Sequence, residues 1–494
     1  MKKLSLLDKG FLLSESRETP MHVGGVSLYT LPEGASSQEF LQDLAENLRS
    51  AEEFVPPFGD LLQTGMLGVA GPCHWKPDQA MDVDYHIRHS ALPQPGRYRE
   101  LFTLISRLHG SLLDRNRPLW ELHLIEGLQD RQFCIYTKMH HAGVDGARSV
   151  HISRSMMSTD PDYRLTESPL SINSWNKYRA KLKGAQASEA EIKNVLEALK
   201  STFDSGAQMY STASRIIRSW GDEGSALVPF QDVPRSSINT SVGGARRFVA
   251  QTWPFARISK VAKTFGGSFN DAVLAMCGGA LRKYLELHGE LPEKSLKAMV
   301  PVSLRQAGDV ESSNAVAMIS ADLGTNVQAA ARRFQVVNAS TKAGKAMFQE
   351  MSAAETQLFS LLLQLPSAFL MPLGLLGRLP PFNTVVSNVP GIKETMYWNG
   401  ARLDGTYPAS IVMDGVAMNI TLCTYGPNVD FGIIACRRSL PQVQRMIDYM
   451  EDALVDLEEA AGITGSPAKN APPKKVPAKK RAARAKAKAA PQKA

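Results

Sequence analysis

Signals for strands and helices alternate twice along the chain, and this repetition is the feature that most constrains the fold. In the first third, an apolar stretch at 25–31 is typical of a strand, and periodic apolar positions predict helices at 36–51 and 97–113. The alternation resumes in the second half, with a strand at 246–253 and a helix at 268–289. Strands that alternate with helices pack as layers around a sheet. The sequence therefore predicts two related α/β domains.

A polar segment separates the two halves. Residues 161–235 are rich in Ser, Lys and Glu and show few strand signals, so they are predicted to form a polar helical linker. This places an N-terminal domain at 1–160 and a C-terminal domain at 236–463. No short-period repeat is present, which argues against a solenoid.

Local signals predict where several elements begin and end. Ser36 and Glu39 have capping-box spacing at the start of one helix. Asn270 is placed to cap the helix at 268–289, and Gly289 is placed to end it. Apolar runs at 119–128 and 132–139, separated by three polar residues, predict two antiparallel strands joined by a short turn.

The basic charge of the chain is concentrated at its end. The formal net charge is +8, but the stretch from Ser466 to Ala494 alone carries ten Lys or Arg and no acid, so the rest of the chain carries −2. The tail, 464–494, lacks apolar periodicity and is predicted to be disordered. Three interpretations stay open: a solvated extension, loose contact with anionic lipid, or loose contact with nucleic acid. A specific nucleic-acid partner is not predicted.

Cysteine use and hydropathy favour a cytoplasmic protein. The five cysteines form no CxxC pair, and charges interrupt the apolar run at the N-terminus before it could act as a secretory signal. The segment 356–377 is uncharged and long enough to span a membrane, but two prolines and a glycine break it. We expect a buried or interdomain helix pair there, or a surface that contacts lipid.

Two adjacent histidines, His140 and His141, end the strand that begins at 132. Successive side chains of a strand face opposite sides, so the two imidazoles are expected to point in different directions. Gly143 and Gly146 allow the tight turn that follows. Asp145 can return toward the strand end, where it can pair with a positive group or hydrogen-bond a ring nitrogen or backbone amides.

Three roles are considered for this histidine pair. Metal binding needs three or four ligands, and no second His or Cys cluster has ligand spacing. Satisfied core histidines are the second interpretation. General base catalysis is favoured, because the doubled His with an Asp and two glycines is unusual for core histidines. A covalent acyl-serine and a nucleotide phosphate site are disfavoured, because no GxSxG serine elbow and no GxxxxGK[ST] phosphate loop occur. A base that helps a hydroxyl attack an activated group such as a thioester contributes typically about 10² to 10⁴ in rate.

The motif HHAGVDG at 140–146 matches the HHxxxDG pattern of acyltransferases related to chloramphenicol acetyltransferase and to peptide-synthetase condensation domains. More narrowly, the chain resembles the bacterial bifunctional wax ester synthase/acyl-CoA:diacylglycerol acyltransferases. The further motifs that carry this resemblance, in the order of that family, are TPMHVGG (19–25), RNRPLWELHLIEGL (115–128), FNDAVLAMCGGALR (269–282), PVSLR (301–305), SNVPG (387–391) and YPASIVMDGVAMNI (407–420).

The resemblance implies a fold and a reaction. It implies two chloramphenicol-acetyltransferase-like domains, each a mixed sheet flanked by helices, with the active site in a tunnel between them. One end of the tunnel would admit acyl-CoA and the other the lipid acceptor, a long-chain alcohol or diacylglycerol. Since acyl-CoA is a substrate, neither a cofactor nor a metal is expected.

Motif position implies the roles of the residues around the histidine pair. His141 would be the general base that deprotonates the acceptor hydroxyl, and His140 would give structural support. Asp145, followed by Gly146, would hold the loop through a salt bridge for which Arg305 is a candidate partner.

Four residues outside this loop are candidates for substrate binding. Asn270 and Asp271 match the Asn-Asp pair of the family, although helix capping is the favoured role for them. Trp120 belongs to the Pro-Leu-Trp motif and is expected to pack rather than to bind the acyl chain. Asn388 lies in the predicted turn SNVPG, a turn that is more often structural than catalytic.

The family link also implies peripheral contact with a membrane or lipid droplet, since both substrates are apolar. Alternatives from other classes stay open. The spacing from His140 to Asp145 also fits the HxxxxD motif of glycerolipid acyltransferases, and the basic tail would suit an inactive lipid-granule binding protein. Another CoA-dependent HHxxxDG acyltransferase is the remaining alternative.

Overall fold

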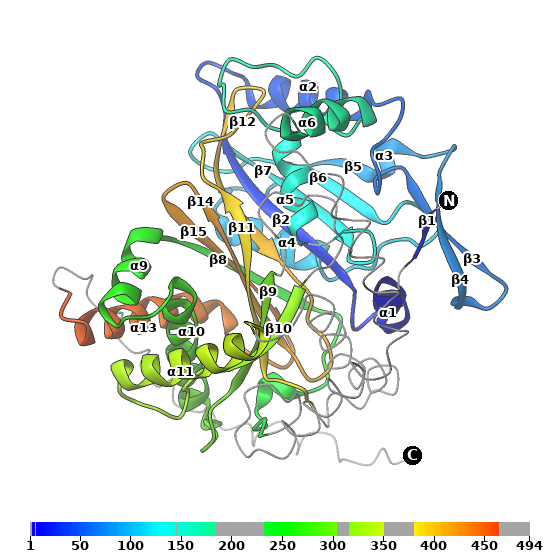
Figure 1. Cartoon of the computed structure of the whole chain (residues 1–494). Helices are drawn as coiled ribbons and strands as arrows, with labels where there is room; N and C mark the ends of the chain where they lie inside the picture. The colour runs from blue at the N-terminus through cyan, green and yellow to red at the C-terminus, as the bar shows by residue number, and fades with distance from the viewer. Residues whose placement is uncertain are drawn as a thin grey trace, which may run out of the picture.

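The chain forms two halves, each built on a six-stranded mixed sheet (Figure 1). The computed structural model describes residues 2–4, 6–144, 146–183, 232–303, 316–349 and 380–463. In Figure 1 the N-terminal half, blue to cyan, lies at the upper right, and the C-terminal half, mostly green to orange, lies at the lower left. This architecture confirms the predicted fold class.

The sheet of the N-terminal half is antiparallel except for its β5–β6 pair, which is parallel. The predicted antiparallel strands at 119–128 and 132–139 are β6 and β7. The strands, in the order in which they lie, are β12 (Tyr397–Trp398), β13 (Ala401–Ala409), β2 (His22–Thr30), β7 (Gln132–His140), β6 (Trp120–Glu126) and β5 (Ile87–Ala91).

Helices cover both faces of this sheet. Leu41 and Leu48 of α2 (Ser37–Arg49) pack with Phe133 and Ile135 of β7 on one face, because odd-numbered β7 residues point to that side. On the other face, Leu101 and Ile105 of α4 (Tyr98–Leu108) pack with Cys134 and Tyr136. The remaining elements of this half are α1 (Leu6–Ser14), α3 (Val83–His86), α4 (Tyr98–Leu108), α5 (Gly146–Ser155), α6 (Ile172–Lys183) and a small sheet of β1 (Lys2–Lys3), β4 (Gly68–Pro77) and β3 (Asp60–Gly65).

The sheet of the C-terminal half encloses its own apolar core. Strand β11 runs parallel to both β9 and β14, and the other neighbours are antiparallel. The strands, in spatial order, are β10 (Val316–Asp322), β9 (Lys297–Ser303), β11 (Thr384–Ile392), β14 (Met418–Tyr425), β15 (Asn428–Cys436) and β8 (Arg246–Pro254). The helices are α9 (Phe255–Thr264), α10 (Phe269–His288), α11 (Ala330–Gln349), α13 (Met446–Ala460) and the short η1 (Ser237–Asn239) and η2 (Val443–Arg445).

The C-terminal half contributes two strands to the sheet of the N-terminal half. Although β12 and β13 follow the C-terminal strands in sequence, β13 pairs with β2 and completes the N-terminal sheet. The crossing brings β13 so close to β15 that a Cβ on Gly432 would collide with the carbonyl oxygen of Pro408. On the other side, the Phe248 amide of β8 donates to Ser106 Oγ of α4 at 2.8 Å. A division of the chain at 160 and 236 therefore does not separate the two sheets.

Of two predicted helix caps, one has the right position and one is wrong. Ser36 is the N-cap residue of α2, as predicted, but its side chain makes no capping hydrogen bond. Asn270 lies inside α10, and the cap is Ser268, which forms a capping box with Asp271. Asn270 and Ser268 are both good capping residues, so sequence preference alone did not distinguish them. Gly289 ends α10 in the left-handed conformation, as predicted.

Several predictions concern residues outside the described ranges. These are the tail at 464–494, the apolar segment at 356–377, most of the linker at 161–235, Asp145 and Arg305. Within the described ranges, we find no helix that combines the length and the apolar character needed to cross a membrane.

Candidate active site

The end of β7 holds the two histidines against both neighbouring strands. His140 pairs with His22 of β2, and its amide donates to the Leu119 carbonyl at 2.9 Å. The next amide, that of His141, donates in the other direction to Met21 at 2.9 Å. Because each neighbour binds one of the two residues, the sheet fixes the backbone of both.

His140 is enclosed, with a side chain 0% exposed. Its Nδ1 accepts the amide hydrogen of Ala142 at 3.1 Å, so the ring proton lies on Nε2. That Nε2 is 3.4 Å from Oε1 of Glu15. An enclosed ring that accepts a hydrogen bond from the turn and lies against a carboxylate is suited to fix the turn after β7 rather than to exchange protons with a substrate.

Glu15 joins the histidine turn to the segment that follows α1. Its carboxylate accepts from the Met21 amide at 3.1 Å and forms an ion pair with Arg115 at 3.0 Å. Burial alone would raise the pKa of Glu15, but His140, Met21 and Arg115 together hold it below its usual value. Glu15 is therefore an anion at neutral pH and a fixed partner for His140.

His141 lies in a different environment, half-buried beside α1. Its ring stacks on Phe11 with centroids 4.2 Å apart and planes 13° apart. The turn that follows is closed by a hydrogen bond of 2.9 Å from the Gly143 amide to the His140 carbonyl, and α5 begins at Gly146. The predicted salt bridge of Asp145 lies outside the described residues. Of the two imidazoles, His141 is the more accessible.

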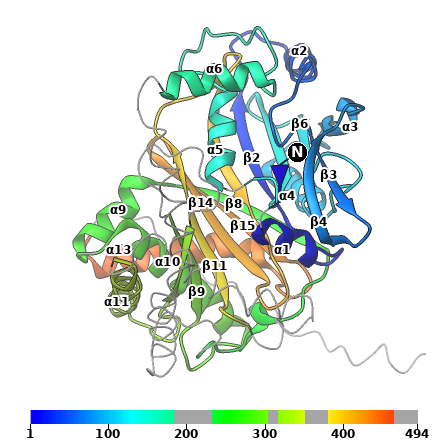
Figure 2. The ribbon, with the colours of Figure 1, turned by 45° about the vertical axis from the view of Figure 1, so that its right-hand side comes forward.

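The structure brings together two of the predicted substrate-binding residues. Asn388 on β11 donates through Nδ2 to Oδ1 of Asn270 on α10 at 2.8 Å, and both residues are half-buried. Strand β11 also packs against α5, the helix that follows the histidine turn (Figure 2). This amide pair therefore lies where the C-terminal half meets the histidine-bearing half.

Asp271, by contrast, is engaged in the cap of α10. Its buried carboxylate accepts from the Ser268 amide and hydroxyl, from Asn338 Nδ2 and from Thr341 Oγ1, at 2.6 to 2.8 Å. Burial raises the pKa of Asp271, but the hydrogen bonds from these donors together outweigh burial, so the pKa lies below its usual value. Four donors match the acceptor capacity of a carboxylate.

Trp120 also belongs to the packed interior, being 1% exposed. Its Nε1 donates to the Phe58 carbonyl at 2.8 Å, and its ring stacks on His86 with centroids 4.6 Å apart. His86 Nδ1 in turn donates to the Trp120 carbonyl. A substrate contact for Trp120 or Asp271 remains a prediction, and the contacts seen for both are structural.

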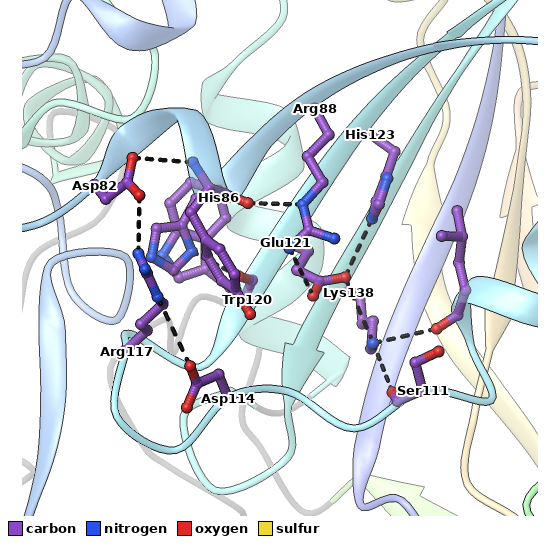
Figure 3. A network of polar contacts seen from close by, with 12 residues as sticks. Asp82, His86, Arg88, Ser111, Asp114, Arg117, Trp120, Glu121, His123 and Lys138 are labelled. Atoms are coloured by element: carbon purple, nitrogen blue, oxygen red, sulfur yellow. Dashed lines mark hydrogen bonds and ion pairs between the residues drawn. The ribbon is translucent and has the colours of Figure 1, made fainter.

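A buried charged cluster underlies this end of the sheet (Figure 3). Lys138 on β7 is 0% exposed, and its Nζ donates to the carbonyls of Leu108 and Ser111 at the end of α4. It also lies 3.5 Å from Glu121 on β6, which contacts His123 and Arg88 at 3.2 and 3.3 Å. The cluster ties α4 to the strand that carries the histidines.

The pKa values of the cluster follow from burial and pairing. Burial would raise the pKa of Glu121, but His123, Lys138 and Arg88 lower it to about 2. Burial lowers the pKa of Lys138, and Glu121 opposes that shift. Sequence reasoning overlooked this cluster, together with Glu15 and Phe11. A lysine and a glutamate inside otherwise apolar strands were the available signal.

Two family models match long segments of the chain. The model of the wax ester synthase/diacylglycerol acyltransferase catalytic domain matches residues 4–273, and the model of the WS/DGAT C-terminal domain matches residues 312–458. The probable diacylglycerol O-acyltransferase tgs2 of Mycobacterium tuberculosis is 42% identical over 92% of this chain and 98% of that protein. The O-acyltransferase WSD of Acinetobacter baylyi is 36% identical over 92% and 96%, respectively.

Solved structures show the same relationship. The wax ester synthase/diacylglycerol acyltransferase from Marinobacter aquaeolei VT8 aligns with a TM-score of 0.74 and 38% identity, covering 94% of this chain and all of that one. The first condensation domain of the CDA synthetase, at 13% identity and a TM-score of 0.53, shares the fold. The chain belongs to the wax ester synthase/diacylglycerol acyltransferase family.

Proposed function

We propose that this protein transfers a fatty acyl group from acyl-CoA to the hydroxyl of a long-chain alcohol or a diacylglycerol. Its family membership and the names of its relatives support acyl transfer. The observation that carries the proposal for this chain is the contrast within HHAGVDG. One imidazole is fully enclosed, with Nδ1 hydrogen-bonded and Nε2 close to Glu15, and its neighbour is half-buried beside an aromatic ring.

His141 acts as the general base in this proposal. The imidazole takes the proton of the acceptor hydroxyl while the oxygen forms a bond to the thioester carbonyl carbon. The tetrahedral intermediate collapses, the carbon–sulfur bond breaks, and the ester is released. The CoA thiolate then takes the proton from the imidazolium. General base help of this kind is worth about 10² to 10⁴ in rate.

The surrounding residues position the base and the substrates. His140 and Glu15 hold the turn that carries His141. Asn270 and Asn388 are proposed as polar substrate contacts, since their amides face each other where the two halves meet. The loop role of Asp145 and Gly146, with Arg305 as the partner of Asp145, belongs to the same proposal.

Contact with a lipid surface is supported by the hairpin that joins β3 to β4. At its tip Met66 and Leu67 are 106% and 76% exposed, although both side chains are apolar. The hairpin packs with α1 and with Ala142 of the histidine turn in one apolar cluster. A tip immersed in lipid would therefore hold the histidine turn close to the supply of acceptor.

The central experiment is an acyl-transfer assay with palmitoyl-CoA. Purified full-length protein receives hexadecanol, dioleoylglycerol or both, and CoA release and the two ester products are measured. We expect stoichiometric release of CoA and formation of ester, with a His141→Ala preparation as the blank. If neither hexadecanol nor dioleoylglycerol is converted to an ester, the proposal is contradicted. The competition between both acceptors ranks them.

A second experiment tests the lipid surface. Replacing Met66 and Leu67 by serine should lower flotation with neutral, acceptor-containing vesicles while changing the free energy of unfolding by less than about 0.5 kcal/mol, as expected for exposed positions. The matched control is Leu287→Ser, an exposed leucine at the end of α10. Equal flotation of all variants would exclude the hairpin tip as a contact.

A further inference from the structure

A large cleft lies beside α4 and β8, and its volume is about 1510 Å³. None of the described residues that line it belongs to the candidate active site. Its most frequent charged residue is arginine, and both halves of the chain contribute. The arginines that line the cleft are Arg17, Arg99, Arg107, Arg246, Arg247 and Arg437.

One wall of the cleft is a face of α4. Arg99, Thr103 and Arg107 follow one another at intervals of four residues, so their side chains form a row along the helix. All three residues are exposed. The helix therefore presents two guanidinium groups and a hydroxyl group to the cleft.

The second wall is the end of the β8–β15 pair. Arg247 of β8 pairs with Ala435 of β15. Two residues further along β15, the amide of Arg437 donates to the Ala245 carbonyl at 3.0 Å. Arg247 and Arg437 are therefore diagonal neighbours on one face of the sheet.

A hydrogen bond joins the two walls. The amide of Phe248 on β8 donates to Ser106 Oγ on α4 at 2.8 Å. Arg107 directly follows Ser106, and Arg247 directly precedes Phe248. Since both arginines also line the cleft, this contact brings guanidinium groups from the two halves into one concave site.

The positive charges of the cleft are largely unpaired. Among the described residues, none of the six arginines forms an ion pair, and Arg246 alone of them makes side-chain hydrogen bonds. Three carboxylates also line the cleft, but one of them, Glu100, is paired with Arg97 at 2.8 Å. Like charges held in a concave site repel one another, and a bound anion would relieve that repulsion.

Arg246 supplies a fixed charge at the base of the second wall. It is buried, and its guanidinium donates to the carbonyls of Gly243, Glu18 and Val412. These are neutral partners, so they hold the group in place without cancelling its charge. Burial lowers the pKa of Arg246 to about 10, which leaves the side chain protonated at neutral pH.

We propose that this cleft is a second ligand site, separate from the acyl-transfer site, and that it binds a phosphate-bearing anion between arginines of the two halves. The proposal goes beyond acyl transfer and does not depend on it. Arginine stays charged and binds phosphate oxygens through paired hydrogen bonds, so guanidinium groups on two walls suit a diphosphate or a phosphate ester. The bound anion would hold α4 against β8, in addition to the Ser106 hydrogen bond.

The test uses the full chain and removes one arginine from each wall. Arg107→Gln and Arg247→Gln, singly and together, are compared with the wild type. The matched control is Arg332→Gln, at an exposed arginine of α11 outside the cleft. Pyrophosphate is titrated by calorimetry, and thermal unfolding is followed with and without it. A parallel arm measures flotation with phosphatidylcholine vesicles that contain or lack phosphatidic acid, because a lipid headgroup offers the same phosphate chemistry.

We expect pyrophosphate to bind the wild type and to raise its unfolding temperature. The double variant should bind pyrophosphate at least about tenfold more weakly, because it loses a charge-assisted hydrogen bond from each wall. Arg332→Gln should match the wild type. The proposal is overturned if the double variant equals the wild type both in pyrophosphate binding and in flotation with phosphatidic acid.

The two arms identify the source of the phosphate. Arginine-dependent binding of pyrophosphate without a change in flotation supports a soluble ligand. Arginine-dependent flotation with phosphatidic acid, without pyrophosphate binding, supports a phospholipid headgroup in the same cleft.

Steady-state kinetics separates the cleft from acyl transfer. The KM for palmitoyl-CoA of the double variant should stay within about twofold of the wild-type value, because the arginines are outside the acyl-transfer site. An increase in KM that parallels the loss of pyrophosphate binding would assign the arginines to the substrate and overturn the proposal. If the wild type transfers no acyl group, the reaction proposed above fails, and the binding measurements still decide the cleft.

Discussion

The two halves share a six-stranded sheet but differ in what they bury. Nine of the ten histidines precede residue 160, and His22, His86, His109, His123 and His140 are buried there together with Lys138 and Glu121. In the C-terminal half, helix α10 buries mainly Ala and Leu side chains within one apolar core, and the buried polar residues of that half, such as Asn383, Asp430 and Glu458, include no histidine. Both halves thus have an apolar core and buried polar groups, but only the half that holds the reactive turn buries histidines.

Buried histidines differ from apolar side chains in how their orientation is set. An apolar core sets separations only through shape, whereas hydrogen bonds also set the direction of a ring and the position of its proton. His109 illustrates this, because its Nε2 donates to the Ser410 carbonyl at 3.0 Å while Nδ1 accepts from the Tyr136 hydroxyl at 2.8 Å. Such a network orients its members, but it becomes costly when one partner is lost.

The largest effect should come from the general base. We expect His141→Ala to lower kcat/KM for acyl transfer by at least about 10²-fold while leaving the free energy of unfolding almost unchanged. His140→Ala should instead lower stability, because the turn loses its link to Glu15. Steady-state kinetics and urea denaturation measured on both variants separate the two roles. Full activity of His141→Ala would remove the basis of the mechanism.

The next largest effect should be a loss of stability when the buried charged cluster of Lys138 and Glu121 is broken. Lys138→Met leaves Glu121 charged and buried without its lysine, and removing one partner of such a pair costs about 3–5 kcal/mol. Urea denaturation measures the loss. The double variant Lys138→Met/Glu121→Gln should recover part of that stability. A single variant as stable as the wild type would show that Glu121 does not need Lys138 as a partner.

A pH titration should sharpen the comparison. Burial lowers the pKa of His109 to about 3 and that of His22 well below its usual value. The unfolded chain binds these protons near pH 6.5 and the folded chain does not. The free energy of unfolding therefore contains the full contribution of these two neutral histidines above that pH. It falls as the pH drops from about 6.5 toward 3, by up to about 1.4 kcal/mol per pH unit for each proton.

His109→Gln should reduce this slope, and His288→Gln, at an exposed histidine of the C-terminal half, should not. The measurement is the urea midpoint at several pH values between 7 and 4. Equal slopes for wild type and His109→Gln would show that His109 does not stay neutral in the folded state over this range.

The smallest effect belongs to the C-terminal half. Ser268→Ala removes the hydroxyl that caps α10, and loss of a cap costs about 1 kcal/mol. Asn270→Ala should cost less stability, because Asn270 is not the cap, but it removes the partner of Asn388. A larger loss of stability for Asn270→Ala than for Ser268→Ala, measured by thermal unfolding, would contradict the capping assignment.

The sequence by itself determined the elements whose signals are local. Apolar periodicity located β6, β7 and α10, and Gly289 marked the end of a helix, because each signal lies within a few residues of the feature it specifies. The doubled histidine at the end of a strand, with glycines after it, identified the candidate site for the same reason.

Only the tertiary structure decided which distant residues meet. Nothing in the local pattern of 397–409 assigns these strands to the sheet of the other half, since strand pairing depends on partners far away in sequence. Likewise, Phe11 and Glu15 become neighbours of His141 and His140, and arginines from both halves gather in one cleft. The position of a reactive group can be encoded locally, whereas its surroundings arise from long-range packing.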